Sequence, residues 1–149
     1  MKNLLVAVDL KSTDQTLLEQ AAILADKFNS KIWLIHIADP DPDFVGYGIG
    51  PKYIRDFRAD ELRHDHVLLQ SHVEDLRDKS IEAEGLLIQG PTVEMIFEEV
   101  EKLQIDILIL GSHKHSFLYQ AFIGHTAVKI IGNISIPIFI VPLPNEAEK

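Results

Sequence analysis

Residues 105–112 read Ile105-Asp106-Ile107-Leu108-Ile109-Leu110-Gly111-Ser112. The apolar run Ile105–Leu110 has the length of a strand. It is nearly continuous rather than alternating, as expected of a strand that is covered on both faces in a parallel sheet. Four further runs have the same strand-like length: Leu4–Val8, Ile32–Ile37, Leu86–Gln89 and Ile136–Val141. The sequence therefore predicts five strands, most of them buried on both sides.

Segments with helical spacing of apolar residues separate these strands. The first, residues 14–28, follows the capping residues Ser12-Thr13-Asp14 and is broken by Asn29-Ser30. A long charged segment covers residues 52–80, Thr92 can cap a third helix that extends to Leu103, and a fourth is expected over 124–131. The expected buried positions are Leu17, Leu18, Ala21, Leu24, Ala25 and Phe28, then Ile54, Phe57, Leu62, Leu69, Val73 and Leu76, then Val93, Ile96, Val100 and Leu103. This alternation predicts an α/β fold, a doubly wound five-stranded parallel sheet with helices on both faces.

Length and charge limit the classes of function. The chain has 149 residues, no cysteine and a formal net charge of −9. We expect one domain over residues 1–144 and a polar tail over 145–149. The acidic balance argues against sequence-independent nucleic-acid binding, which depends on Lys and Arg. No signal peptide or apolar stretch of membrane-spanning length is evident, so a cytoplasmic protein without a membrane segment is expected.

Polar and small residues gather where the predicted strands end. In an open parallel sheet, ligands bind beyond the carboxyl ends of the strands, at the point where the strand order reverses. Asp9 follows the first strand, His36 and Ile37 end the second, and Gly111 to His113 and Lys114 follow the fourth. Gly124-His125-Thr126 opens the fourth expected helix, and a glycine-containing loop with a helix N-terminus is suited to binding an anion. The sequence therefore predicts an anion or phosphate site at this edge.

At these residues the chain resembles the universal stress protein family over nearly its whole length. The resemblance is carried by Leu4-Leu5-Val6-Ala7-Val8-Asp9, Leu34-Ile35-His36-Ile37, Gly90-Pro91, Asp106-Ile107-Leu108-Ile109-Leu110-Gly111-Ser112-His113 and Ile136-Pro137-Ile138-Phe139-Ile140-Val141. It implies an adenine-nucleotide-binding type of α/β fold, a homodimer, a cytoplasmic role in the stress response, and ATP or another adenine nucleotide as ligand. The ligand-contacting residues expected on this basis are Asp9, Ile37, Gly111, His113, Lys114, Gly124, His125 and Thr126.

The chain departs from the family's phosphate-binding pattern, G-x2-G-x9-G-(S/T). Gly111 and Gly124 have the right separation, but the middle glycine is Lys114 and the hydroxyl residue after Gly124 is His125. Thr126 offers a hydroxyl one position away, about 100° around a helix. The Lys114 side chain can obstruct phosphates that would approach the backbone, or its ammonium can hold one from the side.

Several residues admit a structural interpretation beside a functional one. Asp9 can contact a ligand or stabilise a turn, and a histidine inside a strand, such as His36, is more often a hydrogen-bonded structural residue. The three histidines His113, His115 and His125 lack the spacing of a known metal motif, so no metal site is predicted. His64, His66 and His72 belong to a charged helix and are expected on its solvated face. The glycine-rich segment 46–50 lacks the G-x-G-x-x-G spacing and is expected to be a hinge.

The function expected from these features is a dimeric ligand-binding or signalling module in the stress response. No nucleophile–base pair or pair of carboxylates supports catalysis, so no catalytic residue is predicted. Two alternatives stay open: an adenine-nucleotide-binding protein with slow hydrolysis, and an interaction module without a small ligand. The segment Ile136–Val141 is apolar and is expected at a sheet edge, where two copies can pair.

Overall fold

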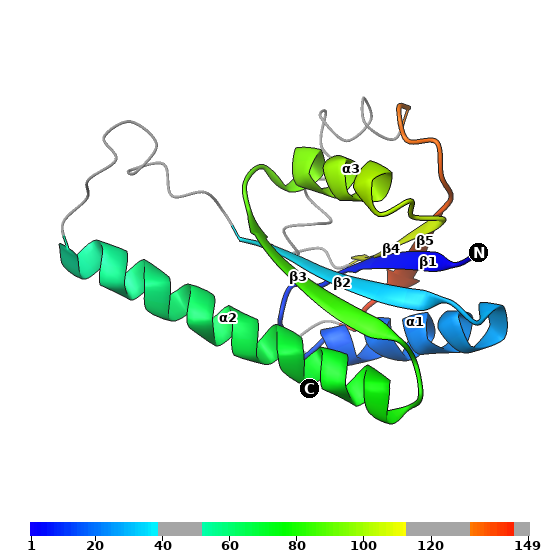
Figure 1. Ribbon diagram of the computed structural model, residues 1–149, viewed down its shortest axis with the longest axis horizontal. Helices are drawn as coiled ribbons and strands as arrows, with labels where there is room; N and C mark the ends of the chain where they lie inside the picture. Colours follow the sequence, from blue (N-terminus) through cyan, green and yellow to red (C-terminus); the bar gives the residue numbers. More distant parts are fainter. Residues whose placement is uncertain (39–51, 113–131, 145–149) are drawn as a thin grey trace.

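The computed structural model describes residues 1–38, 52–112 and 132–144. Five parallel strands form one sheet in the order β3-β2-β1-β4-β5 (Figure 1). The strands are β1 (Asn3–Ala7), β2 (Lys31–Ala38), β3 (Ala83–Gln89), β4 (Ile107–Ser112) and β5 (Ile138–Pro142). The predicted doubly wound five-stranded parallel sheet is confirmed. No helix in the described parts of the chain is long and apolar enough to cross a membrane.

The helices cover both faces of the sheet, as the sequence predicts. Two of them, α1 (Asp14–Phe28) and α2 (Lys52–Asp78), lie on one face, and α3 (Thr92–Lys102) lies on the other (Figure 1). The core is correspondingly divided in two. Leu17 of α1 and Val73 of α2 belong to the first cluster, and Ile96 of α3 belongs to the second. The helix expected over 124–131 lies outside the described residues, as do the expected hinge and the polar tail.

Three strands begin two or three residues away from the positions that the sequence predicts. β3 begins at Ala83 rather than Leu86 and includes Gly85, where a Cβ atom would lie 3.1 Å from Leu69 Cγ and 3.2 Å from Val73 Cγ2. Gly85 therefore lets α2 approach the sheet closely. Because glycine has no side chain, it also interrupts the apolar run, so the sequence places the start of this strand too late. β4 begins at Ile107 because the Ile105 N–H donates to the Val100 carbonyl in the turn after α3. β5 begins at Ile138, after Pro137, which has no N–H to donate.

Two further expectations, both about the ends of helices, are wrong. Thr92 is the first residue of α3 rather than its cap, and its buried hydroxyl has no hydrogen-bond partner among the residues that the structure describes. Phe28, expected to be buried, is 47% exposed at the last turn of α1. The helix break at Asn29 is confirmed: this residue has a left-handed backbone with φ of 53°, and its N–H donates to the Ala25 carbonyl.

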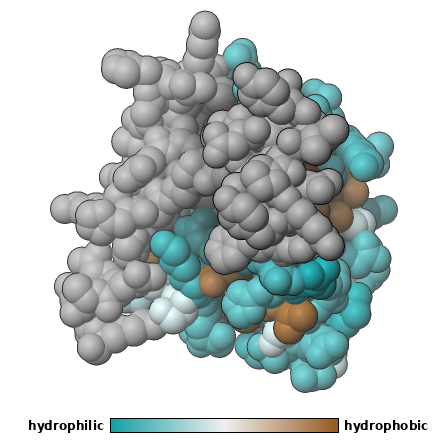
Figure 2. All heavy atoms as spheres, turned by 90° about the vertical axis from the view of Figure 1, so that its left-hand side faces the viewer, coloured by the Kyte–Doolittle hydropathy of each residue, from teal (hydrophilic) through white to brown (hydrophobic). Residues whose placement is uncertain are grey.

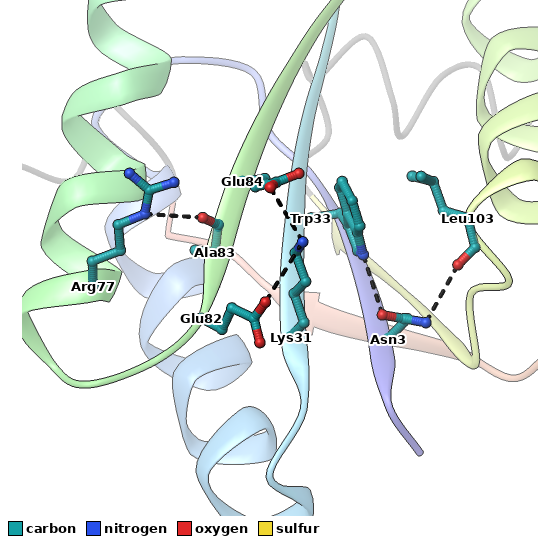
Figure 3. Close-up of polar contacts among 8 residues, drawn as sticks. All are labelled: Asn3, Lys31, Trp33, Arg77, Glu82, Ala83, Glu84 and Leu103. Carbon is teal, nitrogen blue, oxygen red and sulfur yellow. Dashed lines mark hydrogen bonds and ion pairs between the residues drawn. The ribbon is translucent and has the colours of Figure 1, made fainter.

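Polar side chains connect the strands at the amino-terminal edge of the sheet. Asn3 accepts a hydrogen bond from Trp33 Nε1 at 3.3 Å and donates to the Leu103 carbonyl at 3.3 Å (Figure 3). Lys31 Nζ lies 3.3 Å from a carboxylate oxygen of Glu84 and 3.9 Å from the centre of the Trp33 ring. These contacts stabilise the edge opposite to the one where ligands bind in such folds.

Candidate functional site

The strand order reverses between β1 and β4. From β1 the chain continues to β2 and β3 on one side, whereas β4 is followed by β5 on the other. The register pairs Val6 with Ile109, so Asp9 and Ser112 each come three positions after a paired residue. The carboxyl ends of β1 and β4 therefore lie side by side at the switch point, where open α/β sheets bind ligands.

This carboxyl edge faces left in Figure 1 and toward the viewer in Figure 2. The described residues on that face are mostly hydrophilic, with small hydrophobic patches between them (Figure 2). A separate groove of about 480 Å³ lies between α1 and the turn after α2, lined by Ile23, Asp26 and Lys79 among others. Because α1 starts at the carboxyl edge and runs away from it, this groove is distant from the switch point.

Gly111 is buried at the end of β4. A Cβ atom placed on it would collide with the Leu143 side chain, whose Cγ would be 3.0 Å away. Leu143 follows β5 and packs on the α1–α2 core cluster. The glycine that the sequence analysis assigned to a phosphate loop is thus also required by the packing of the neighbouring strand.

Asp14 organises the turn between β1 and α1. Its carboxylate accepts hydrogen bonds from the backbone N–H groups of Leu10 at 2.7 Å and Asp9 at 3.3 Å. The side chain is almost fully buried, and this burial raises the pKa of Asp14 above its usual value although both N–H groups act in the opposite direction. Asp9 is five residues before the start of α1, so it is not the cap of that helix.

His36 is the hydrogen-bonded structural histidine that the sequence predicts. Its Nδ1 lies 2.8 Å from the carbonyl oxygen of Val8, and its Nε2 lies 3.7 Å from Oδ2 of Asp65 on α2. His72, expected on the solvated face of α2, is instead half-buried, with Nε2 3.9 Å from Oδ2 of Asp14. The expectation of a solvated position is therefore wrong for His72.

The other expected ligand-contacting residues divide into two groups. Ile37 is buried in the core cluster beneath α3, so its side chain serves packing. The remaining residues, His113, Lys114, Gly124, His125 and Thr126, lie outside the described part of the chain, as does His115. Among the residues that the structure describes, no group of three or more histidine or acidic side chains could hold a metal ion.

Sequence reasoning missed Asp14, Asp65 and His72 as residues of this region. A signal for two of them exists in the spacing of α2. Asp65 precedes the buried Leu69 by four residues, and His72 follows it by three, so both lie on the helix face that packs against the sheet. Polar residues at apolar-stripe positions are candidates for buried partners.

Comparisons with known proteins agree with this architecture. A profile described as the universal stress protein family matches residues 1–142. Universal stress protein C of Escherichia coli O157:H7 is 28% identical over 150 residues, covering 97% of each chain. The fold is also similar to a universal stress protein family protein from Arabidopsis thaliana with AMP bound (TM-score 0.66, 17% identity, 99% of this chain and 95% of that one). It is likewise similar to the universal stress protein of Archaeoglobus fulgidus in complex with dAMP (TM-score 0.65, 16% identity, 97% and 98%).

The parallel sheet with a switch point between β1 and β4 defines an α/β protein with a doubly wound open sheet. Since the family profile covers nearly the whole chain, the protein belongs to the universal stress protein family.

Proposed function

We propose that this protein binds an adenine nucleotide at the β1–β4 switch point and acts as a ligand-dependent module in the stress response. The observation that carries the proposal is the reversal of strand order, which brings Asp9 and Gly111 to adjacent strand ends. The similar folds with AMP and dAMP bound support the choice of an adenine nucleotide. A cysteine-free chain is compatible with the reducing cytoplasm, where we propose that it works.

In this proposal Asp9 contacts the base or ribose, and the segment from Gly111 to Lys114 contacts the phosphates together with residues 124–126. The missing glycine at Lys114 leads us to expect weak binding. Lys114→Gly strengthens ATP binding if the lysine side chain only obstructs the phosphates. If this change abolishes binding, Lys114 is a phosphate ligand and the steric interpretation is wrong.

The test is calorimetry and thermal-shift measurement of dialysed protein with ATP, ADP, AMP and cyclic AMP. We expect saturable binding that Asp9→Ala weakens. Asp75→Ala is the control because it removes an exposed carboxylate of α2 and the same charge. An absence of binding for all four nucleotides would leave the interaction-module alternative, and equal effects of the two substitutions would remove Asp9 from the site.

We further propose that ATP hydrolysis is absent or close to background. Phosphoryl transfer needs positioned phosphates, usually Mg²⁺, and a residue that orients water. At the described strand ends of the switch point, Asp9 is the carboxylate that could take such a role. Steady-state release of phosphate that is lost in Asp9→Ala would favour the slow-hydrolase alternative.

A homodimer through Ile136–Val141 is part of the proposal. β5 is an edge strand of the sheet, and its Phe139 and Ile140 are 39% and 58% exposed. Because the Pro137 carbonyl accepts from Leu108 of β4, alternation directs the N–H groups of Ile138 and Ile140 to the open edge. An apolar edge of this kind favours pairing, and two copies can pair antiparallel about a twofold axis.

Light scattering at micromolar concentration tests the dimer. We expect a dimeric mass for the natural chain and a monomeric mass for Ile140→Lys. Ile23→Lys is the matched control, since Ile23 is 53% exposed on α1, away from β5. A monomeric natural chain, or a dimer that survives Ile140→Lys and Phe139→Asp, would contradict this interface.

A further inference from the structure

The end of β1 is held in place by side chains from two other elements. The Val8 carbonyl accepts a hydrogen bond from His36 Nδ1 of β2 at 2.8 Å. The next two backbone N–H groups, those of Asp9 and Leu10, donate to the Asp14 carboxylate at 3.3 and 2.7 Å. One imidazole and one carboxylate therefore form hydrogen bonds with three consecutive residues at the switch point, where the Val8 N–H also donates to the Ile35 carbonyl at 2.9 Å.

Both of these groups are paired with α2. Asp65 faces His36 across 3.7 Å, and His72 faces Asp14 across 3.9 Å. Asp65 and His72 are seven residues apart, which is two helical turns, so one face of α2 supplies both. In the pair His36–Asp65 the helix α2 supplies the acid, whereas in the pair Asp14–His72 it supplies the histidine. We refer to His36–Asp65 and Asp14–His72 as the paired clamps.

The backbone that the clamps hold is strained. Leu10 has a φ of 61°, in the left-handed region that a non-glycine residue adopts at a cost of about 1–2 kcal/mol. Such a conformation persists when surrounding contacts impose it. The Leu10 N–H itself donates to Asp14 at 2.7 Å, so Asp14 is a contact that holds this conformation.

The proton state of each histidine changes its clamp. Because the Val8 carbonyl can only accept, Nδ1 of His36 carries a proton, so neutral His36 turns the lone pair of Nε2 toward Asp65. A second proton turns this contact into a charge-assisted pair. Protonated His72 attracts the buried Asp14 in the same way, and nearby Asp9 adds a further negative charge. Proton uptake by His36 and His72 therefore tightens both clamps.

We propose that His36, Asp14, Asp65 and His72 are positioning residues for the ligand site, and that protonation of the two histidines increases its affinity for adenine nucleotides. This inference rests on the proposed function, because it assigns a regulation to the same switch point. Among the residues that the structure describes, the charged and titratable groups that take part are the two clamps and Asp9. Lower pH then strengthens binding through the position of Asp9 and through added positive charge near an anionic ligand.

The test measures the Kd for AMP by calorimetry at pH 8 and pH 6 in the natural chain, His36→Gln and His72→Gln. AMP itself titrates in this range, so each variant is compared with the natural chain at the same pH. We expect the ratio of variant Kd to natural Kd to be about fivefold larger at pH 6 than at pH 8, a typical size of coupling between sites. His64→Gln is the control, since it removes an exposed histidine from the same helix. For His64→Gln we expect the ratio of variant Kd to natural Kd to be the same at pH 6 and pH 8.

A second readout needs no ligand. The Leu10 amide proton, which donates to Asp14, is followed by NMR between pH 8 and 6, and we expect its shift to titrate in the natural chain and not in His72→Gln. A Leu10 signal independent of pH overturns the inference whether or not AMP binds. A titrating signal with a constant Kd ratio also overturns it and leaves the proposed function standing. If AMP does not bind at either pH, the proposed function fails, while a titrating Leu10 signal still supports the clamps.

Discussion

Asp106 joins the first strand to the fourth, and replacing it with asparagine isolates the contribution of its charge. One carboxylate oxygen, Oδ2, accepts the backbone N–H of Lys2 at 2.7 Å and that of Asn3 at 3.0 Å. These two hydrogen bonds lower the pKa of Asp106, that of Asn3 first. Asp106→Asn keeps the shape of the side chain but removes the charge and leaves one oxygen to accept.

The structure gives the size of the effect. A hydrogen bond to a charged group contributes about 1.5–3 kcal/mol and a neutral one about 0.5–1.5 kcal/mol. The Lys2 bond is exposed and the Asn3 bond is partly buried, so solvent screening reduces both values. We expect Asp106→Asn to lower the free energy of unfolding by about 1 kcal/mol at pH 7, which is about 2–4 °C in Tm for a domain of this size.

Urea denaturation as a function of pH is the assay, with Asp75→Asn as the control for the loss of one exposed charge. A carboxyl whose pKa is lowered on folding stabilises the fold at pH values above its pKa of 3.8 in the unfolded chain. This contribution disappears as the pH falls through the lower pKa of the folded state. The difference between the natural chain and Asp106→Asn must therefore shrink below pH 3.8. Equal stability of Asp106→Asn and Asp75→Asn at pH 7 would refute the reasoning, and so would a difference that does not change with pH.

Three further substitutions test packing and hydrogen bonding away from the charges. Gly111→Ala lowers the free energy of unfolding by about 1–3 kcal/mol because its Cβ collides with Leu143. In thermal denaturation, we expect Gly111→Ala to have no such cost when it is added to Leu143→Ala. Gly85→Ala pushes α2 away from β3 and costs about 1 kcal/mol in the same measurement, whereas an unchanged Tm would mean that the helix shifts freely. Asn3→Ala leaves the Trp33 indole N–H without its partner and costs about 1–2 kcal/mol in urea denaturation; a fluorescence spectrum and stability equal to the natural chain would contradict that role.

The fold could be predicted from the sequence because its signals are local. Continuous apolar runs mark strands that are buried on both faces, and Ile107–Leu110 shows this without interruption. The boundaries were less predictable, since Ile105 is as apolar as its neighbours and only the hydrogen bond to Val100 assigns it to the preceding turn. Phe28 has the right spacing for burial, but it is the last residue of α1 and is exposed there.

The candidate site was only partly predictable for a different reason. Asp9 and Gly111 could be proposed because strand ends and glycines are visible in the sequence. The packing of α2 on the sheet creates two contacts between distant residues, Asp14 with His72 and His36 with Asp65. The spacing of α2 places His72 on the face that packs against the sheet, but it does not name the partner on the other segment.

The central place of β1 in the sheet has a consequence for synthesis of the chain. β1 is made first, yet its two neighbours are β2, which ends at Ala38, and β4, which begins at Ile107. At about 5–20 residues per second, some 3 to 14 s separate the appearance of these two partners. During that interval the nascent β1–β2 pair presents the apolar edge of Leu4, Leu5 and Val6 with nothing to cover it, and we expect this stage to be the one at which the emerging chain needs a chaperone.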